Sequence, residues 1–162
     1  MEKLINKKLM ELIEFTNSMI PEEWDELYIN GDINGDEGGI FFYYRISDEW
    51  IYSHDMFKKY ENYSKSEFIE NWNNLFFIGA SLQQIFRDYN QQIWSKMIIH
   101  VSKEMKLSTE FDYADWYNSD YVDYEYKDYF RVNYLGQGPI HVGMDVVQEI
   151  REFKIKENSK QR

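Results

Sequence analysis

Histidine and cysteine, the side chains that most often bind zinc and that act in many catalytic sites, are scarce in this 162-residue sequence. The sequence contains no cysteine and three histidines, His54, His100 and His141. None of the histidines lies at the spacing from another histidine that a zinc site requires. Without cysteine there is no disulfide, no thiolate nucleophile and no thiolate metal ligand. These residues predict neither a metal site nor a cysteine-dependent reaction.

Two short motifs contain the residue types of known sites but lack their geometry. Ser53-His54-Asp55 has the residues of a catalytic triad, but adjacent side chains point in different directions, and a triad is assembled in space. Residues 32–36 begin like a calcium-binding loop, yet Glu37 replaces the required glycine and Tyr43 replaces the bidentate glutamate. Carboxylate pairs arise by chance among 29 acids. We therefore expect a protein that is not an enzyme and that uses no cofactor or metal.

Charge is the strongest global signal, because 18 basic and 29 acidic residues give a net charge of −11. Residues 22–37 contain seven acids and no base, and residues 110–128 contain seven acids and one base. Nucleic acids and anionic membranes are bound mainly through basic groups, so neither is an expected partner. An acidic surface keeps a protein soluble, and it also attracts basic proteins over long distances.

The second acidic segment is also rich in aromatic residues. Tyrosine and tryptophan are common in protein interfaces because they bury a large area and keep a polar tip. Phe111 and Tyr113 also suit a core, in which case the acids form a solvated face. We predict a binding surface in this segment, with residues 22–37 as the alternative location. The predicted surface consists of Asp112, Asp115, Trp116, Asp120, Tyr121 and Asp123.

Hydrophobic periodicity predicts the elements at the start of the chain. Apolar residues at helical spacing indicate a first helix that ends before Pro21. Residues 25–33 and 40–46 are rich in strand formers, and Asn34-Gly35 between them predicts a hairpin. A shorter run over residues 50–53 continues the meander.

A long central helix is the clearest element of the sequence. Ser64 and Glu67 form a capping box at its start, and apolar residues mark one face as far as Tyr89. Gly79 lies in that face, where it favours close packing against a sheet. Residues 93–101 and 106–113 then alternate as strands do.

The last third of the chain predicts two more helices and a tail. Residues 126–134 fit a helix weakly, residues 144–154 fit one better, and residues 157–162 form a polar tail that we expect to be frayed. Strands joined by hairpins and separated by a long helix predict an α+β fold. We expect one domain over residues 1–162, with an antiparallel sheet of about five strands packed with N-terminal, central and C-terminal helices. Neither a membrane-spanning helix nor a secretory signal is expected, which favours the cytoplasm.

Several short motifs resemble those of the YezG-like immunity proteins. Three motifs near the start of this chain resemble the N-terminal part of that family's sequences. They are Ile20-Pro21-Glu22-Glu23-Trp24, Leu27-Tyr28-Ile29 and the aromatic strand Phe41-Phe42-Tyr43-Tyr44. Later landmarks are Trp94-Ser95, Phe111-Asp112-Tyr113-Ala114-Asp115 and Tyr134-Leu135-Gly136. They follow the family order and cover about residues 1–155. Two departures, an insert at residues 31–39 and the altered residues 116–119, bear on which toxin is recognised.

The resemblance implies an immunity protein, or antitoxin, for a polymorphic toxin that a Gram-positive bacterium exports by type VII secretion. The best-known members bind and inhibit the C-terminal nuclease domain of the toxin, and the family has no catalytic residues to transfer. The expected partner is therefore a cognate toxin with a basic nuclease domain, neutralised by stoichiometric occlusion through an acidic, aromatic-rich surface. The alternative is a non-catalytic binding module whose exposed aromatics hold a carbohydrate or a peptide.

Overall fold

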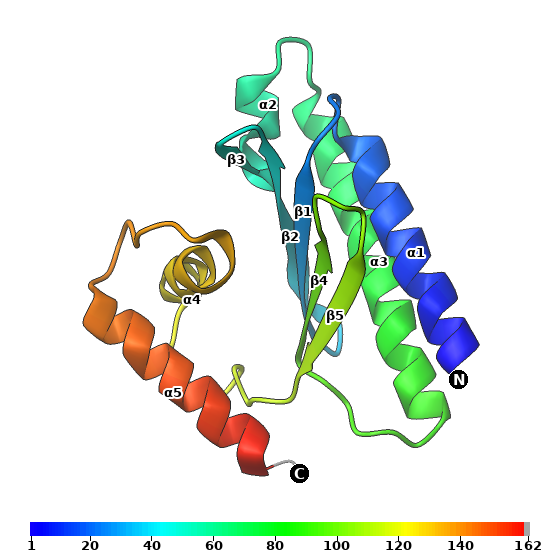
Figure 1. Cartoon of the computed structure of the whole chain (residues 1–162). Helices are drawn as coiled ribbons and strands as arrows, with labels where there is room; N and C mark the ends of the chain where they lie inside the picture. The colour runs from blue at the N-terminus through cyan, green and yellow to red at the C-terminus, as the bar shows by residue number, and fades with distance from the viewer. Residues whose placement is uncertain (161–162) are drawn as a thin grey trace. The chain divides into compact units, whose positions relative to one another are not determined.

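The computed structural model describes residues 1–160, which fall into two compact units. Unit 1 is Met1–Phe111 and contains a β-sheet with helices (Figure 1). Unit 2 begins at Asp112 and contains the helices of the last third of the chain. The expectation of one domain over the whole chain stays a prediction, and each unit is described by itself.

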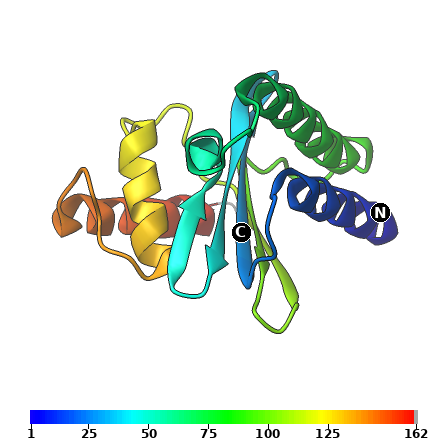
Figure 2. The ribbon, with the colours of Figure 1, turned by 90° about the horizontal axis from the view of Figure 1, so that it is seen from above.

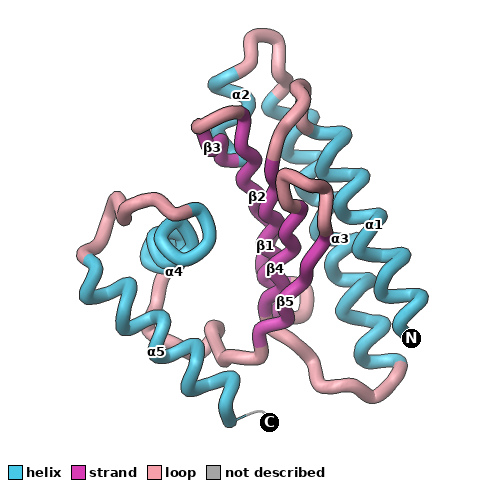
Figure 3. The backbone as a smooth tube through the Cα atoms, viewed as in Figure 1, coloured by secondary structure: helices cyan, strands magenta, loops and turns pink. Residues whose placement is uncertain are grey.

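Unit 1 is built on an antiparallel sheet with the strand order β3-β2-β1-β4-β5 (Figure 3). The strands are β1 (Glu26–Asn34), β2 (Glu37–Ile46), β3 (Glu49–Tyr52), β4 (Lys96–Val101) and β5 (Leu107–Asp112). Within residues 1–160, these five strands and the surrounding helices confirm the predicted α+β fold with an antiparallel sheet.

The predicted hairpin between the first two strands is confirmed. Asn34 pairs with Glu37, which leaves Gly35 and Asp36 as a two-residue turn. Gly35 has a φ of +67°, a left-handed conformation that glycine adopts without steric cost. Most of residues 31–39 are paired across β1 and β2, with Gly31 opposite Ile40. The insert noted in the sequence therefore lengthens the paired strands.

Two long helices cover one face of this sheet, as Figure 2 shows. They are α1 (Glu2–Met19) and α3 (Lys65–Asp88), and a short turn η1 (Ser53–Asp55) with α2 (Met56–Lys59) follows β3. The Ser64 side chain accepts a hydrogen bond from the Glu67 N–H at 3.2 Å, which confirms the predicted cap.

Gly79 allows α3 to lie close to the sheet. A Cβ atom at this position would lie 2.7 Å from Ile33 Cδ1 and 3.0 Å from Ile40 Cδ1, which is closer than carbon atoms normally approach. The neighbouring Gln83 is buried and donates hydrogen bonds to the carbonyls of Ile33 (3.0 Å) and Trp94 (2.8 Å). One face of α3 therefore holds the end of β1 and the entry to β4.

Unit 2 consists of an ordered segment followed by two helices. These are α4 (Asp123–Phe130), which continues into the π-helical turn Arg131–Leu135, and α5 (Met144–Lys160). Both predicted helices are confirmed. Helix α5 continues through residues 157–160, where a frayed tail was expected, and residues 161–162 of that tail lie outside the described part. No helix within residues 1–160 has both the length and the apolar character needed to cross a membrane.

Candidate functional site

Two of the six predicted surface residues, Asp112 and Trp116, are buried within unit 2. Asp112 is 1% exposed and Trp116 is 7% exposed. Asp112 Oδ1 accepts hydrogen bonds from the Ala114 N–H and from Asn158 Nδ2, both at 2.9 Å. Its other oxygen accepts one from Trp116 Nε1 at 2.8 Å. The expectation that these two residues form part of the surface is wrong, because their polar atoms satisfy each other inside the unit.

The ring of Trp116 belongs to the aromatic core of unit 2. Its centroid lies 5.0 Å from that of Tyr126 on α4 and 5.0 Å from that of Phe153 on α5. Both contacts are edge-to-face, a favourable arrangement for aromatic pairs. Asp112 and Trp116 thus fix the segment onto the two helices and position the residues that are exposed.

Trp116→Phe separates the two roles of this side chain. Phenylalanine keeps most of the ring contacts but cannot donate to the buried Asp112 oxygen, so we expect the free energy of unfolding to fall by about 1–3 kcal/mol. Urea unfolding followed by circular dichroism measures this change. Tyr117→Phe is the control, because Tyr117 is 66% exposed and its substitution should change stability very little. Equal stability of both variants would contradict the role assigned to the indole N–H.

The other predicted residues lie at the surface. Asp115, Asp120 and Asp123 are exposed, and Tyr121 is half-buried. Asp115 accepts a hydrogen bond from Asn118 Nδ2 at 2.9 Å, which keeps its carboxylate beside the turn that it begins. The Asp123 side chain is 76% exposed and pairs with Lys127 at 2.8 Å one turn along α4. An exposed pair of this kind contributes little to stability.

Tyr121 lies near four carboxylates. Its ring packs against Phe153, with the ring centroids 5.4 Å apart. Burial and four nearby carboxylates raise the pKa of the Tyr121 hydroxyl. We call Tyr121 together with these acids the Tyr121 patch. The four acids are Asp120, Glu125, Glu149 and Glu152.

Sequence reasoning found only part of this patch. Glu149 and Glu152 lie on α5, well outside the segment singled out by composition. Their spacing of three residues places them on the same side of a helix, which is a signal available in the sequence. The spacing does not predict that this side of α5 lies near Tyr121, because the packing of α4 against α5 is a tertiary contact.

Several acids of the alternative segment, residues 22–37, are engaged within unit 1. Glu26 accepts from Arg45 Nε at 3.1 Å and contacts His100 Nε2 at 2.6 Å. Glu22 accepts from the Tyr60 hydroxyl at 2.5 Å. Burial and this hydrogen bond raise the pKa of Tyr60 to about 12. These contacts engage Glu22 and Glu26 within unit 1, whereas Glu23, Asp36 and Glu37 of the same segment are exposed.

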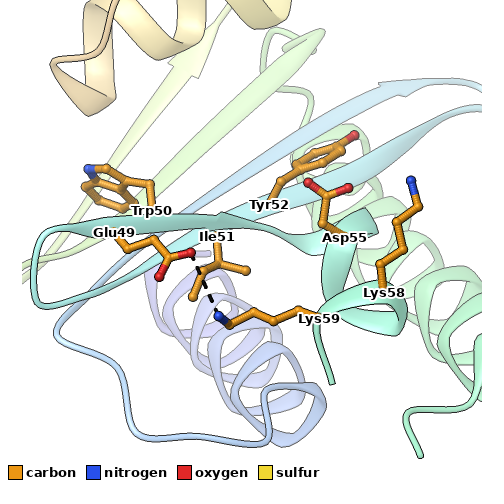
Figure 4. Close-up of a pocket in the computed structure, with 7 residues that line it drawn as sticks. All are labelled: Glu49, Trp50, Ile51, Tyr52, Asp55, Lys58 and Lys59. Atoms are coloured by element: carbon orange, nitrogen blue, oxygen red, sulfur yellow. Dashed lines mark ion pairs between the residues drawn. The ribbon is translucent and has the colours of Figure 1, made fainter. Parts of the chain in front are cut away.

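Unit 1 also has a shallow cleft of about 440 Å³ along the edge strand β3 (Figure 4). Lys59 Nζ crosses it to Glu49 Oε1 at 3.8 Å. The lining residues include neither a serine nor a histidine, so the cleft contains no serine–histidine pair. Across residues 1–160, no three histidine or carboxylate side chains gather as a metal site requires. The lining residues are Glu49, Trp50, Ile51, Tyr52, Asp55, Lys58 and Lys59.

Comparison with known proteins identifies the family. Residues 5–148 match the family described as "Immunity protein YezG-like". The chain belongs to the YezG-like immunity proteins. The resemblance seen in the sequence motifs is thereby confirmed.

Two relatives show how far this YezG-like chain matches known members. It is 29% identical over 159 residues to the type VII secretion system protein EsaG of Staphylococcus aureus, an alignment that covers 96% of each chain. It is 27% identical over 120 residues to the immunity protein YezG of Bacillus subtilis, which covers 72% of this chain and 79% of that protein. The match to EsaG thus spans both units.

The boundary of the family match falls within the Tyr121 patch. The matched residues include Asp120, Tyr121 and Glu125 and end at residue 148, immediately before Glu149. Of the patch residues of this YezG-like protein, Glu149 and Glu152 lie after the end of the family match, on α5.

Proposed function

We propose that this YezG-like protein is an immunity protein that binds the cognate toxin of its own cell in the cytoplasm and neutralises it by stoichiometric occlusion. Family membership supports the immunity role. Two Bacillus relatives are named immunity protein YezG, and the Staphylococcus aureus relative is named as a type VII secretion system protein. The protein acts by binding and not by catalysis.

The Tyr121 patch is the observation that favours a basic partner. A half-buried aromatic ring among four carboxylates suits a lysine or arginine side chain, which gains charge attraction and contact with the ring face. The groove of a nuclease that binds phosphates presents such cations. Exposed Asp115 and Asp123 extend the negative charge along the same segment. We therefore propose the nuclease C-terminal domain of the toxin as the target.

Occlusion is consistent with the charge of the chain. A net charge of −11 accelerates the encounter with a cationic surface and disfavours any complex with nucleic acid. An interface of about 1,600 Å² is enough for tight binding when aromatic anchors are buried at its centre. The toxin is then blocked at the surface that its substrate needs.

A titration of nuclease activity tests this proposal. The probe is the purified nuclease-like C-terminal domain of a secreted toxin from the same organism, assayed separately on DNA and on RNA. Activity should fall linearly and reach its minimum at one equivalent of this protein, and added salt should weaken the inhibition. Full activity at a large excess of this protein would overturn the proposal. Salt-insensitive binding of a carbohydrate or peptide would favour the binding-module alternative.

A further inference from the structure

A second surface of unit 2 is organised by a buried carboxylate on α4. Asp128 is fully buried, and its Oδ2 accepts three consecutive backbone N–H groups. These come from Ile140 (3.1 Å), His141 (2.5 Å) and Val142 (2.8 Å). Consecutive N–H groups that converge on one anion hold the backbone in a single conformation. The loop between the π-helical turn and α5 is therefore fixed to α4.

Two side chains of this fixed loop are exposed. Ile140 is 67% exposed, and His141 is also exposed. The ring of His141 contacts the ring of Tyr124, with the centroids 5.8 Å apart, and Tyr124 is itself 53% exposed. Tyr124 lies on α4 one turn before Asp128. We call Tyr124, Ile140 and His141 the loop platform.

The loop platform differs from an ordinary exposed apolar residue. Single exposed apolar side chains are common on soluble proteins and need no explanation. Here the rings of His141 and Tyr124 are in contact, Ile140 precedes His141 in the chain, and a buried charge orients the backbone that carries Ile140 and His141. A preorganised surface loses less conformational entropy when it binds. This arrangement is typical of the apolar centre of an interface.

The charges around the loop platform indicate its partner. The stretch of chain that carries the platform, residues 120–145, contains five acids and two bases, and one of the acids, Asp128, is buried. Both bases are already paired, Lys127 with Asp123 and Arg131 with Asp128. A second copy of this chain and a nucleic acid both carry negative charge, so both are repelled. The surface that fits is a cationic protein surface with an apolar patch.

We propose that the loop platform forms the apolar centre of the toxin interface, with Tyr124 and Ile140 packed against an apolar patch of the basic toxin face. This inference rests on the proposed function and assigns it a second contact surface. The Tyr121 patch accelerates association and sets the register of the complex, while the loop platform slows dissociation.

Alanine substitutions at Ile140 and Tyr124 test the inference. The binding partner is the same purified toxin C-terminal domain, and Kd and its salt dependence are measured by surface plasmon resonance. Each substitution should raise Kd by about tenfold or more, mainly through faster dissociation. The salt dependence should stay unchanged because no charge is removed. Ile155→Ala is the matched control, since Ile155 is 62% exposed on α5 of the same unit and should leave Kd unchanged.

Each result discriminates between the inference and the proposed function. If the wild-type protein binds the toxin domain and both variants bind it equally well, the proposed role of the loop platform is wrong while the proposed function stands. A wild-type chain that binds no toxin overturns both. Sedimentation of the free proteins tests the second-copy alternative, since a wild-type dimer that Ile140→Ala dissociates would assign the surface to self-association. Melting curves that match wild type establish that the variants are folded.

Discussion

Replacing Asp128 by asparagine is expected to lower the free energy of unfolding by about 3–5 kcal/mol, because it breaks the ion pair of a fully buried carboxylate and leaves the largely buried Arg131 without its partner. In the native protein, Asp128 Oδ1 accepts from Arg131 Nη1 at 2.6 Å while Oδ2 accepts the three loop N–H groups. An asparagine has only one oxygen. Its amide NH₂ must face either Arg131 or the loop N–H groups, so donors would oppose donors.

Urea unfolding measures the global loss, and amide hydrogen exchange shows where it occurs. The amides of Ile140, His141 and Val142 should exchange much faster in the variant. Asp123→Asn provides the control on the same helix. The Asp123 side chain is exposed and pairs with Lys127, so its replacement should change stability by less than about 1 kcal/mol. Equal protection of the three amides in wild type and Asp128→Asn would show that the carboxylate does not hold the loop.

The same substitution should alter the pH dependence of stability. Burial raises the pKa of Asp128, but the hydrogen bonds from the His141, Val142 and Ile140 N–H groups and the charge of Arg131 outweigh it, so the pKa is lowered overall. Because the pKa of Asp128 is lower in the native state than in the unfolded state, the ionised carboxylate stabilises the fold. This stabilisation is complete above the unfolded-state pKa of about 3.9 and is lost as the pH falls through the native pKa. The stability difference between wild type and Asp128→Asn should therefore be constant near neutrality and narrow below about pH 4. An unchanged difference in acid would contradict this assignment.

Local signals in the sequence predicted most of the elements. The capping residues Ser64 and Glu67, the Asn34-Gly35 turn and the alternation along the strands depend on neighbours a few residues away. Gly79 was also interpreted correctly as a point of close approach between helix and sheet. These features could be predicted because short-range chemistry determines them.

The candidate site depends on contacts that the sequence does not reveal. Asp112 was predicted to be a surface acid, but one of its donors is Asn158, on α5. Asp128 lies in the same acidic segment, yet it is fully buried because its hydrogen-bond donors come from a loop that begins after the next helical turn. Composition located the right segment, while tertiary packing decides which of its carboxylates face solvent. The acids Glu149 and Glu152 joined the patch for the same reason.

Reversing the charge of the Tyr121 patch should have the largest effect on toxin binding. In the triple variant Asp120→Lys, Glu149→Lys and Glu152→Lys, three carboxylates around the Tyr121 ring become cations. A basic toxin surface is then repelled where it was attracted, so we expect Kd to rise by about 100-fold or more, largely through slower association. All three residues are exposed, so the fold should be retained. Stopped-flow association rates at several salt concentrations measure the effect, which should shrink as salt increases.

A matched variant in the other acidic segment makes this prediction specific. Glu23→Lys, Asp36→Lys and Glu37→Lys also reverse three exposed acids, so the two triple variants have the same net charge. A purely global attraction to the toxin would slow association equally in both. We expect a large change in the association rate only in the Tyr121 patch variant. A toxin cation that binds against the Tyr121 ring is affected by nearby charges far more than by distant charges, which salt screens. The opposite pattern would move the interface to the hairpin turn of unit 1, where Asp36 and Glu37 lie.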